Sequence, residues 1–393
     1  MLWQHYVFRR GLDVHTMWDQ LFEKRHSPFV HYRSRIRCAC TRGNEGFRRE
    51  CPQSGHKIDE AKLLLVGFSG YHLSPELNEQ TEQNATELKE TFNSLGQTVD
   101  ILIGPSAAGE EDISASNALR IGADEVLGHL ENQTDIILDA SSLPRVAYLA
   151  LITGLLNRLV PDKAAPDALF ANGVNFQIVV GEDAGLDSQI RSEDPSNDPV
   201  LIPGFSSALH AETAQDWPLV WFPLLGENRV SQLEKVMAST IPTLAEICPV
   251  LPHPSRDPRR ADRLLVEYTR PLFDTRETPT TNIMYAHEDH PFEAYRQLLG
   301  AMKRYLESLR VIGGCRLVVT PLGSKLITIG AALACFEMRP PAMTENYGIA
   351  IPCSQPARYV VSKEILLSAK PEISALLVTG DAYHSQTPSD LND

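Results

Sequence analysis

Short apolar runs alternate with longer helix-like segments along most of this chain, and this alternation constrains the fold most. The apolar runs are residues 62–68, 99–104, 134–139, 175–180, 219–222, 247–251, 282–285, 315–320 and 347–351. Strands that alternate with helices build right-handed βαβ units around a parallel sheet. The pattern therefore predicts an α/β protein built from two Rossmann-like halves with mainly parallel sheets.

The length of 393 residues favours two domains, since one domain usually takes about 100–200 residues. A stretch rich in Asp, Ser, Pro and Gly, residues 181–203, reads as the connection between them. We expect a small irregular basic N-terminal extension over residues 1–57 and a first Rossmann-like half over 58–203. The second half would span 204–384, and a disordered polar tail would cover 385–393.

Charge is distributed unevenly along the chain. The net charge is −14, yet residues 1–57 hold eleven Lys and Arg against five Asp and Glu. The acidic remainder argues against broad nucleic-acid binding, because affinity for phosphate backbones comes from basic groups. The basic segment either contacts an anion or RNA, or docks on the acidic body of the chain itself.

Compartment signals favour a cytoplasmic protein. No run of about 18 apolar residues predicts a membrane span, and the N-terminus lacks the apolar core of a secretory signal. Seven scattered cysteines fit a reducing compartment better than a disulfide framework.

Two strand–loop–helix segments share one layout. The first is DIILDASSLPRVAYLALITGLL, with the loop Ser141–Arg145, and the second is CRLVVTPLGSKLITIGAALACFE, with the loop Pro321–Lys325. Each loop joins the carboxyl end of an apolar strand to a helix and ends in a basic residue. The repetition favours two halves of similar topology.

The chemistry of these two loops suits an anion. A loop that leads into a helix presents backbone N–H groups and the positive end of the helix dipole. We predict that Arg145, Ser324 and Lys325 hold phosphate groups. Ser141, Ser142 and Gly323 would allow close approach. The alternative is purely structural, because Ser caps helices, Pro starts them and Gly forms turns.

The second segment resembles a known family signature. Thr320-Pro-Leu-Gly-Ser-Lys325, followed by the small-residue helix 329–334, looks like the loop of CARF-type Rossmann domains, with Leu322-Gly323 in place of the usual doubled glycine. Two such halves resemble the SAVED arrangement. The resemblance implies binding of a cyclic or linear oligonucleotide second messenger between the halves, in bacterial antiphage defence. Such a sensor would need a protein effector partner and would form a homo- or hetero-oligomer.

A further glycine-containing loop follows the first strand. Gly67 and Ser69 lie in the stretch Val66–His72, which has the spacing G-x-x-G rather than the dinucleotide pattern G-x-G-x-x-G. No acidic residue ends the second strand, so NAD binding is not expected. We keep Gly67 and Ser69 as candidate ligand contacts.

The N-terminal segment contains a possible metal-ligand set. Cys38, Cys40, Cys51 and His56 have the residue types of a Cys3His zinc site, which would stabilise a small basic module that lacks a core. The alternative is three free thiols in a loop. Beyond this structural zinc, the sequence leaves any cofactor unidentified.

The densest group of titratable residues is His287-Glu288-Asp289-His290, between a predicted strand and the helix that starts at Pro291. These four side chains could coordinate a divalent metal or perform acid–base catalysis. They would then define a nucleotide or sugar-phosphate hydrolase or transferase. The alternative is helix capping.

Four arginines stand out in the acidic second half, at positions 256, 259, 260 and 263. They either bind phosphate or pair with Asp257 and Asp262. Three function classes therefore remain open: a sensor of a phosphorylated nucleotide-like ligand, an enzyme acting on such a ligand, and a non-catalytic scaffold.

Overall fold

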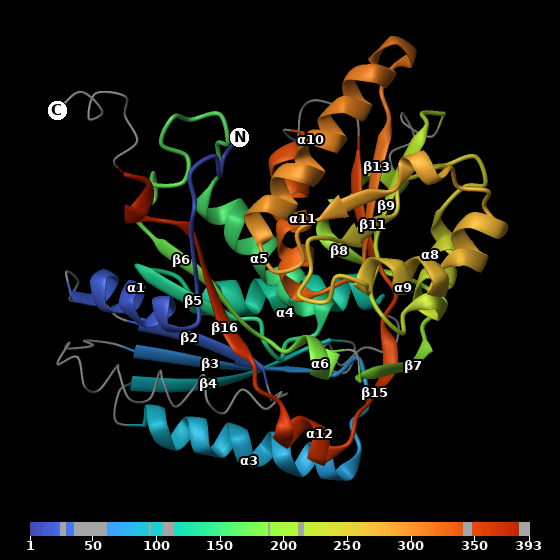
Figure 1. Ribbon diagram of the computed structural model, residues 1–393. Helices are drawn as coiled ribbons and strands as arrows, with labels where there is room; N and C mark the ends of the chain where they lie inside the picture. The colour runs from blue at the N-terminus through green and yellow to red at the C-terminus, as the bar shows by residue number, and fades with distance from the viewer. Residues whose placement is uncertain are drawn as a thin grey trace. The chain divides into compact units, whose positions relative to one another are not determined.

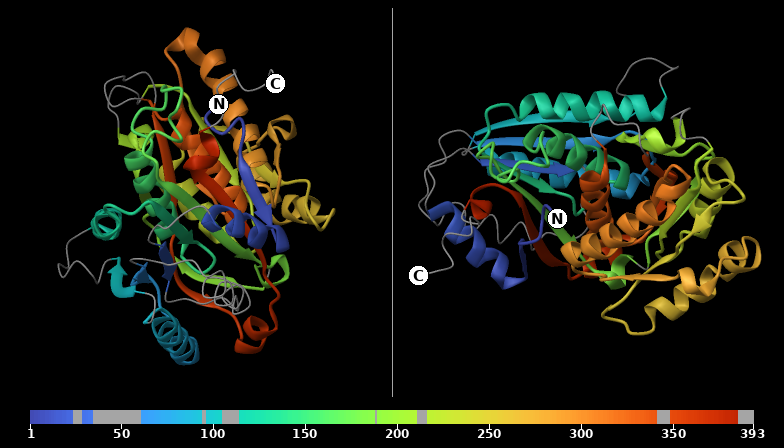
Figure 2. Two further views of the ribbon diagram at one scale, coloured as in Figure 1. Left: turned by 90° about the vertical axis from the view of Figure 1, so that its left-hand side faces the viewer. Right: turned by 90° about the horizontal axis from the view of Figure 1, so that it is seen from above.

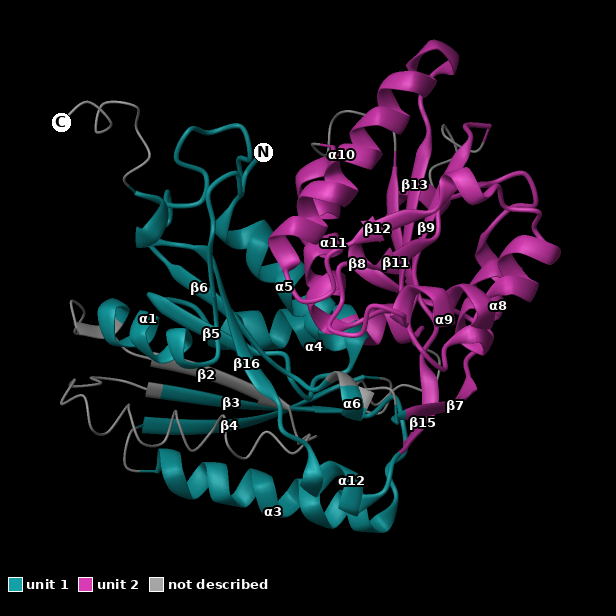
Figure 3. Cartoon of the chain, in the orientation of Figure 1, with its two compact units in different colours: residues 1–113, 120–190, 361–393 teal, residues 114–119, 191–360 magenta. Residues whose placement is uncertain are grey.

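A computed structural model describes residues 1–23, 29–34, 61–93, 96–104, 114–187, 189–210, 216–340 and 348–384. The chain forms two compact units (Figure 3). Unit 1 comprises residues 1–113, 120–190 and 361–393, and unit 2 comprises residues 114–119 and 191–360. Both units combine helices with mainly parallel sheets, which confirms the predicted fold class.

Unit 1 contains, within its described residues, a seven-stranded sheet (Figure 1). In spatial order its strands are β1 (Val7–Arg10), β16 (Glu372–Thr379), β6 (Asn175–Glu182), β5 (Asp135–Asp139), β2 (Phe29–Ser34), β3 (Ala61–Phe68) and β4 (Gly96–Ile103). The five strands from β6 to β4 are parallel. Strands β16 and β1 are antiparallel to their neighbours.

The helices of unit 1 cover this sheet. They are α1 (Leu12–Glu23), α3 (Pro75–Phe92), α4 (Ala115–His129), α5 (Arg145–Leu159), α6 (Ala184–Asp187), α12 (Lys363–Ser368) and the 3-10 turn η6 (Asp381–Tyr383). Leu63 and Leu65 of β3 share a core with α1 and α3. Leu64 and Val66 alternate with them and are equally buried, so both faces of β3 are covered.

Unit 2 contains a second sheet. In spatial order its strands are β12 (Met284–Ala286), β11 (Val250–Pro252), β9 (Leu219–Leu224), β13 (Arg316–Pro321), β14 (Ile349–Cys353) and β8 (Val200–Ser206), with β10 (Glu246–Ile247) also on β9. The strands from β12 to β14 are parallel, and β8 is antiparallel to β14. A separate ribbon pairs β7 (Arg191–Pro195) with β15 (Pro356–Val360).

The helices of unit 2 form two groups. They are α7 (Ser207–His210), α8 (Val230–Thr240), α9 (Arg260–Glu267), the π-helix η3 (Thr269–Asp274), the 3-10 turn η4 (Thr280–Asn282), α10 (Pro291–Leu309), the 3-10 turn η5 (Arg310–Ile312) and α11 (Lys325–Met338). Helices α8 and α9 share a core with Trp221 of β9. Helices α10 and α11 pack closely, because Gly330 lies against the carbonyl of Pro291 (Figure 2).

Both units have the same order of parallel strands. Numbered along the chain within each unit, the order is 3-2-1-4-5: β4-β3-β2-β5-β6 in unit 1 and β12-β11-β9-β13-β14 in unit 2. An antiparallel strand then follows the fifth strand in each. In this topology the connections reverse direction between strands 1 and 4, which creates a switch point where open α/β sheets bind ligands.

The structure departs from the sequence prediction at the N-terminus. Residues 1–57 are not only an irregular extension, since Val7–Arg10 forms an edge strand and Phe29–Ser34 forms the first parallel strand of unit 1. Phe29–Ser34 was missed because Phe, Val and Tyr are interrupted by His, Arg and Ser rather than forming an apolar run. Backbone bonds to β3 and β5 hold it in the sheet.

Two further segments differ from the prediction. Residues 191–195 form a strand inside the stretch 181–203 that was interpreted as a connection, and the strand of residues 200–206 begins inside it. The chain also returns to unit 1 after residue 360, where Glu372–Thr379 pairs with β6. The units are thus discontinuous in sequence, whereas the predicted halves were continuous. The pattern of apolar residues identifies a strand but does not reveal which sheet it joins.

The predicted tail, residues 385–393, lies outside the described part of the chain. Among the described helices, none is long and apolar enough to cross a membrane.

The α10–α11 contact gives a stability prediction. In Gly330→Ala the added Cβ would lie 2.3 Å from the carbonyl oxygen of Pro291, so the helices must separate. We expect a loss of about 1–3 kcal/mol, the usual cost of overpacking. Gly128→Ala is the control: nothing lies within 4 Å of that Cβ on α4, and we expect a gain of about 0.5–1 kcal/mol. Urea-induced unfolding measures both, and equal effects would contradict this packing.

Candidate functional site

The switch point of unit 2 lies where β9 and β13 end. Leu224 and Pro321 are register partners there, and the N–H of Leu322 donates to the carbonyl of Leu224 at 2.9 Å. Gly226 is needed at this place, because a Cβ on it would lie 2.3 Å from the carbonyl oxygen of Leu322. The loops after the two strands are therefore in direct backbone contact.

The predicted residues Gly323, Ser324 and Lys325 lie at this switch point. A Cβ on Gly323 would lie 3.2 Å from the carbonyl oxygen of Leu225, which keeps the two loops close. Ser324 is the N-cap residue of α11, but its hydroxyl does not cap the helix and donates instead to the carbonyl of Glu288 at 3.2 Å. Lys325, partly buried, is the first residue of α11.

A buried arginine connects the neighbouring loops. The Nε and one terminal nitrogen of Arg260 donate to the two carboxylate oxygens of Glu227, each at 2.6 Å. Its other terminal nitrogen contacts Oε1 of Glu288. Arg260 and Glu288 are 6% and 5% exposed. Arg260 thus connects the loops after β9, β11 and β12. The hydroxyl of Ser324 connects the loop after β13 to Glu288.

The charge of Arg260 controls the ionisation of Glu227. Burial raises the pKa of this carboxyl, but the hydrogen bonds and charge of Arg260 outweigh it and hold the pKa below the ordinary 4.5. Glu227 is therefore ionised at neutral pH. The group of Glu227, Arg260 and Glu288 is a charge-assisted network in which one guanidinium serves two carboxylates.

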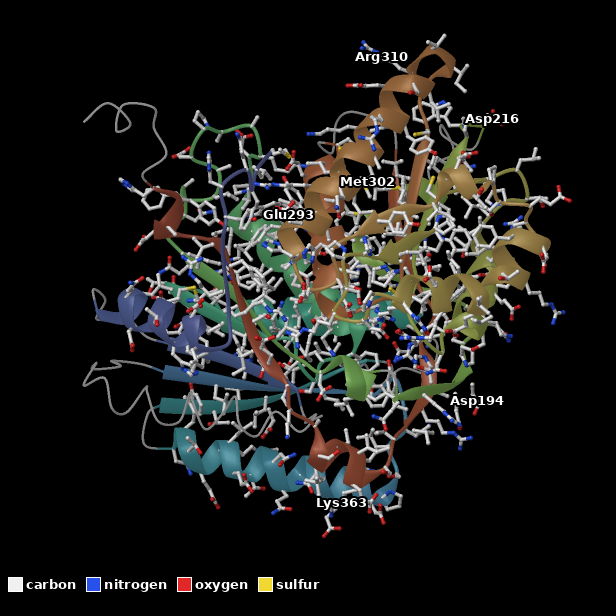
Figure 4. All side chains as sticks on the ribbon, in the orientation of Figure 1. Asp194, Asp216, Glu293, Met302, Arg310 and Lys363 are labelled. Atoms are coloured by element: carbon white, nitrogen blue, oxygen red, sulfur yellow. The ribbon has the colours of Figure 1, made fainter. Side chains whose placement is uncertain are left out.

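The four predicted catalytic residues make contacts that organise their own loop. Glu288 is held by Arg260, and its N–H donates to the carbonyl of Pro254 at 3.1 Å. His290 is the N-cap of α10, where its Nδ1 accepts the N–H of Glu293, a residue of the first helical turn (Figure 4), at 3.3 Å. Burial lowers the pKa of His290, although Glu293 opposes this shift. A neutral imidazole suits the accepting role.

His287 and Asp289 form the other pair of this cluster. Nδ1 of His287 lies 3.0 Å from Oδ1 of Asp289, but without the alignment of a hydrogen bond. Asp289 also lies 3.7 Å from Nε of Arg256. The alternative of capping by the acidic residues is wrong, because Glu288 and Asp289 contact Arg260 and Arg256 while His290 caps the helix.

A metal role finds no support within the described residues, where no group of three or more His, Cys, Asp or Glu could hold a metal ion. This covers the cluster of residues 287–290. The predicted zinc ligands Cys38, Cys40, Cys51 and His56 lie outside the described residues, so that site stays a prediction.

In unit 1 the switch point lies between β2 and β5, and the loop after β5 carries the predicted residues. Oδ1 of Asp139 accepts the N–H of Ser141 at 2.9 Å, and Oγ of Ser141 accepts the N–H of Gly181 at 2.7 Å. Ser141 and Ser142 are buried, while Arg145 is partly buried at the start of α5. Ser141 thus holds the β5 loop to β6 and does not cap α5, whose N-cap is Pro144, so its role is structural but differs from the predicted capping.

Gly67 and Ser69 lie away from that switch point. Gly67 is inside β3, opposite Leu102, rather than in a loop after the strand. Ser69 follows β3, and its N–H donates to the carbonyl of Ile103 at 2.9 Å. Gly104 allows this contact, because a Cβ there would lie 2.6 Å from Oγ of Ser69. These residues secure the adjacent pair of strands.

The four arginines of unit 2 make different contacts. Arg263 pairs with Asp257 at 2.5 Å, as one alternative predicted. Arg260 pairs with Glu227 and Glu288, not with Asp262. Arg256 contacts Asp289, and Arg259 is exposed and makes no ion pair within the described residues.

Sequence reasoning missed Gly226 and the role of Glu227. A signal was present: Pro223-Leu-Leu-Gly226 after one strand is similar to Pro321-Leu-Gly323 after another. Two similar turns at neighbouring strand ends are what a close approach of two loops requires.

The two basic loops lie in different units, so the predicted cleft between the halves stays a prediction.

Among known proteins, no family model and no curated protein matches this chain. Solved structures that match include the cytoplasmic domain of a prokaryotic cation chloride cotransporter, at 8% identity and a TM-score of 0.23, covering 84% of this chain and 96% of that one. Another is a universal stress protein from Archaeoglobus fulgidus, at 12% identity and a TM-score of 0.22, covering 84% and 97%.

The arginine network gives a stability prediction. Arg260→Met would leave two carboxylates without their buried cation, so we expect a loss of about 3–5 kcal/mol in the free energy of unfolding at pH 7. Arg259→Ala removes an exposed neighbour without an ion pair and should change it by less than about 0.5 kcal/mol. Similar losses in both variants in urea titrations would show that Arg260 does not hold the loops.

Glu227 gives a pH prediction. Its pKa is lowered in the folded protein, so its contribution to stability is present above the ordinary value of 4.5 and is lost as the pH falls through the folded pKa. The stability difference between the wild type and Glu227→Gln should be constant from about pH 6 to 8 and should narrow below about pH 4.5. Urea unfolding at a series of pH values measures this, and a difference that widens on acidification would contradict it.

Proposed function

We propose that this protein binds a nucleotide-like phosphorylated ligand at the carboxyl edge of its sheets, without transforming it. One observation carries the proposal. The two loops with the same layout, Ser141–Arg145 and Pro321–Lys325, each follow the fourth strand of a 3-2-1-4-5 sheet. Each therefore adjoins a switch point, the place where this topology binds ligands.

The chemistry of unit 2 supports an anionic ligand. Lys325 begins α11, where the helix dipole and the ammonium charge act in the same direction. Gly226 and Gly323 are buried and let the two loops pack backbone against backbone next to Lys325. The Glu227–Arg260–Glu288 network carries one net negative charge, so the attraction must come from Lys325 and from exposed arginines such as Arg259.

The network makes its contribution through rigidity. Arg260 and Ser324 connect the loops after β9, β11, β12 and β13, so these four loops are held before a ligand arrives. A preorganised site loses less conformational entropy on binding. This is the reason to assign Arg260 a positioning role and Lys325 a contact role.

We extend the proposal along the resemblance to CARF and SAVED domains. The ligand would be a cyclic or linear oligonucleotide second messenger that Arg145 and Lys325 hold in a cleft between the halves. The protein would be a cytoplasmic sensor in a bacterial defence system, within an oligomer that includes an effector partner. The loop Thr320–Lys325 supports this identity of the ligand.

An enzyme is the second candidate, and the 3.0 Å approach of His287 to Asp289 favours it, because a carboxylate beside an imidazole can orient a general base. The other two residues of that cluster are engaged, Glu288 with Arg260 and His290 as a helix cap. Binding is therefore the better reading of the geometry.

Calorimetry with a panel of nucleotides and of linear and cyclic oligonucleotides tests the proposal. Lys325→Ala should weaken the binding of the tightest ligand roughly 10- to 100-fold, the scale of a charged hydrogen bond. Lys363→Ala is a matched control, since Lys363 also follows a Ser N-cap at a helix start but lies on the short helix α12, which follows the two-stranded ribbon strand β15 and not a parallel strand. Equal effects of the two changes, or no binding by any member of the panel, would refute the assignment.

Chromatography of the same mixtures separates a sensor from an enzyme. We expect the ligand to be recovered unchanged. Product formation that is lost in His290→Asn would instead establish an enzyme, because asparagine retains an N-cap acceptor but has no titratable imidazole.

A further inference from the structure

A second place in unit 2 has the form of a small-molecule site. A pocket of about 360 Å³ lies between the last turns of α10 and the start of β12. Its walls come from Ile283 and Met284 on one side and from Arg304, Ser308 and Leu309 on the other. The volume is at the lower end of the range for ligand pockets.

The pocket is separate from the switch point. Arg304 lies thirteen residues along α10 from Pro291, a distance of roughly 20 Å at 1.5 Å per residue. The lining residues 281–284 precede or begin β12, whereas the loop of residues 287–290 follows β12. A ligand here would contact the amino-terminal edge of the sheet, so this inference does not rest on the proposed function.

The lining combines an apolar surface with three polar groups that lack protein partners. Ile283, Met284 and Leu309 supply apolar surface. Within the described residues, the exposed side chains of Thr281 and Ser308 make no hydrogen bond, and the exposed side chain of Arg304 makes no ion pair. A ligand with an apolar body and a hydrogen-bonding head would satisfy both kinds of surface.

The inner end of the pocket is neutral and already hydrogen-bonded. Sγ of Cys248 lies 3.1 Å from the hydroxyl of Tyr305, which lies 3.5 Å from Oε1 of Glu246. Burial raises the pKa of the Cys248 thiol to about 11, so no thiolate forms at neutral pH. Cys248 and Tyr305 therefore add no charge and leave Arg304 as the charged group of the lining.

Glu246 is the nearest acidic group to the inner end. Its Oε1 accepts the amide of Asn282 at 2.7 Å, and Glu246 does not line the pocket. The guanidinium of Arg304 lies over Gly300, where a Cβ would be 3.5 Å from its terminal nitrogen. The charge that a ligand would meet is thus positive.

We infer that this pocket binds a small organic carboxylate with an apolar body, its carboxylate on Arg304 and its body against Ile283, Met284 and Leu309. The guanidinium supplies paired donors suited to a carboxylate. The apolar surface supplies contact area that a bare inorganic ion would not use.

Benzoate and benzamide are a matched pair of probes, since they share a ring and differ in charge. In protein labelled with methyl-¹³C methionine, benzoate should shift the resonance of Met284, assigned through Met284→Leu. Met302 of α10 (labelled in Figure 4), which is fully buried and does not line the pocket, is the internal reference. A roughly tenfold higher concentration of benzamide than of benzoate should be needed to give the same shift.

Arg304→Gln should remove the preference for benzoate over benzamide, while Arg310→Gln, a change of a nearby exposed arginine outside the lining, should retain it. Hexanoate and hexanamide repeat the comparison with a straight chain. If neither carboxylate shifts Met284, or if acid and amide shift it alike in both pairs, the inference is overturned.

Discussion

The buried guanidinium of Arg260 is the interaction on which the carboxyl edge of unit 2 depends. Parallel strands bring their loops to one edge but do not fix how those loops meet. Arg260 contacts carboxylates from the loops after β9 and β12 while it begins the helix that follows β11. Burying a charged group is costly unless it is paired, so the loops can adopt this arrangement only together.

This dependence bears on the choice between binding and catalysis. A general acid or base must exchange a proton with a substrate, and a carboxylate that holds a buried guanidinium does so only by weakening that contact. Glu288 is in this situation, and His290 accepts a helix N–H. Much of the titratable group at residues 287–290 is thus explained by structure.

The sequence was informative where a single element carries its own pattern. Helix α5 and helix α11 begin at Arg145 and Lys325 as the strand–loop–helix pattern predicts, and the parallel sheets follow from the alternation of elements. It was uninformative where an element depends on its neighbours. Phe29–Ser34 has no apolar run, and the pairing of Glu372–Thr379 with β6 joins segments almost 200 residues apart. The pairing of Arg260 with Glu227 is of the same kind, since it joins residues 33 positions apart.

The two switch points are similar in topology but different in chemistry. In unit 1 the carboxylate of Asp139 and the hydroxyl of Ser141 are bound to backbone N–H groups, so the polar atoms of that loop stabilise the loop itself. In unit 2 Gly226 and Gly323 are buried and bring the two loops into backbone contact, so the glycines hold the loops together. The switch point of unit 1 is thus fixed by polar side chains bound to backbone, whereas that of unit 2 is fixed by backbone packing and by the Arg260 network.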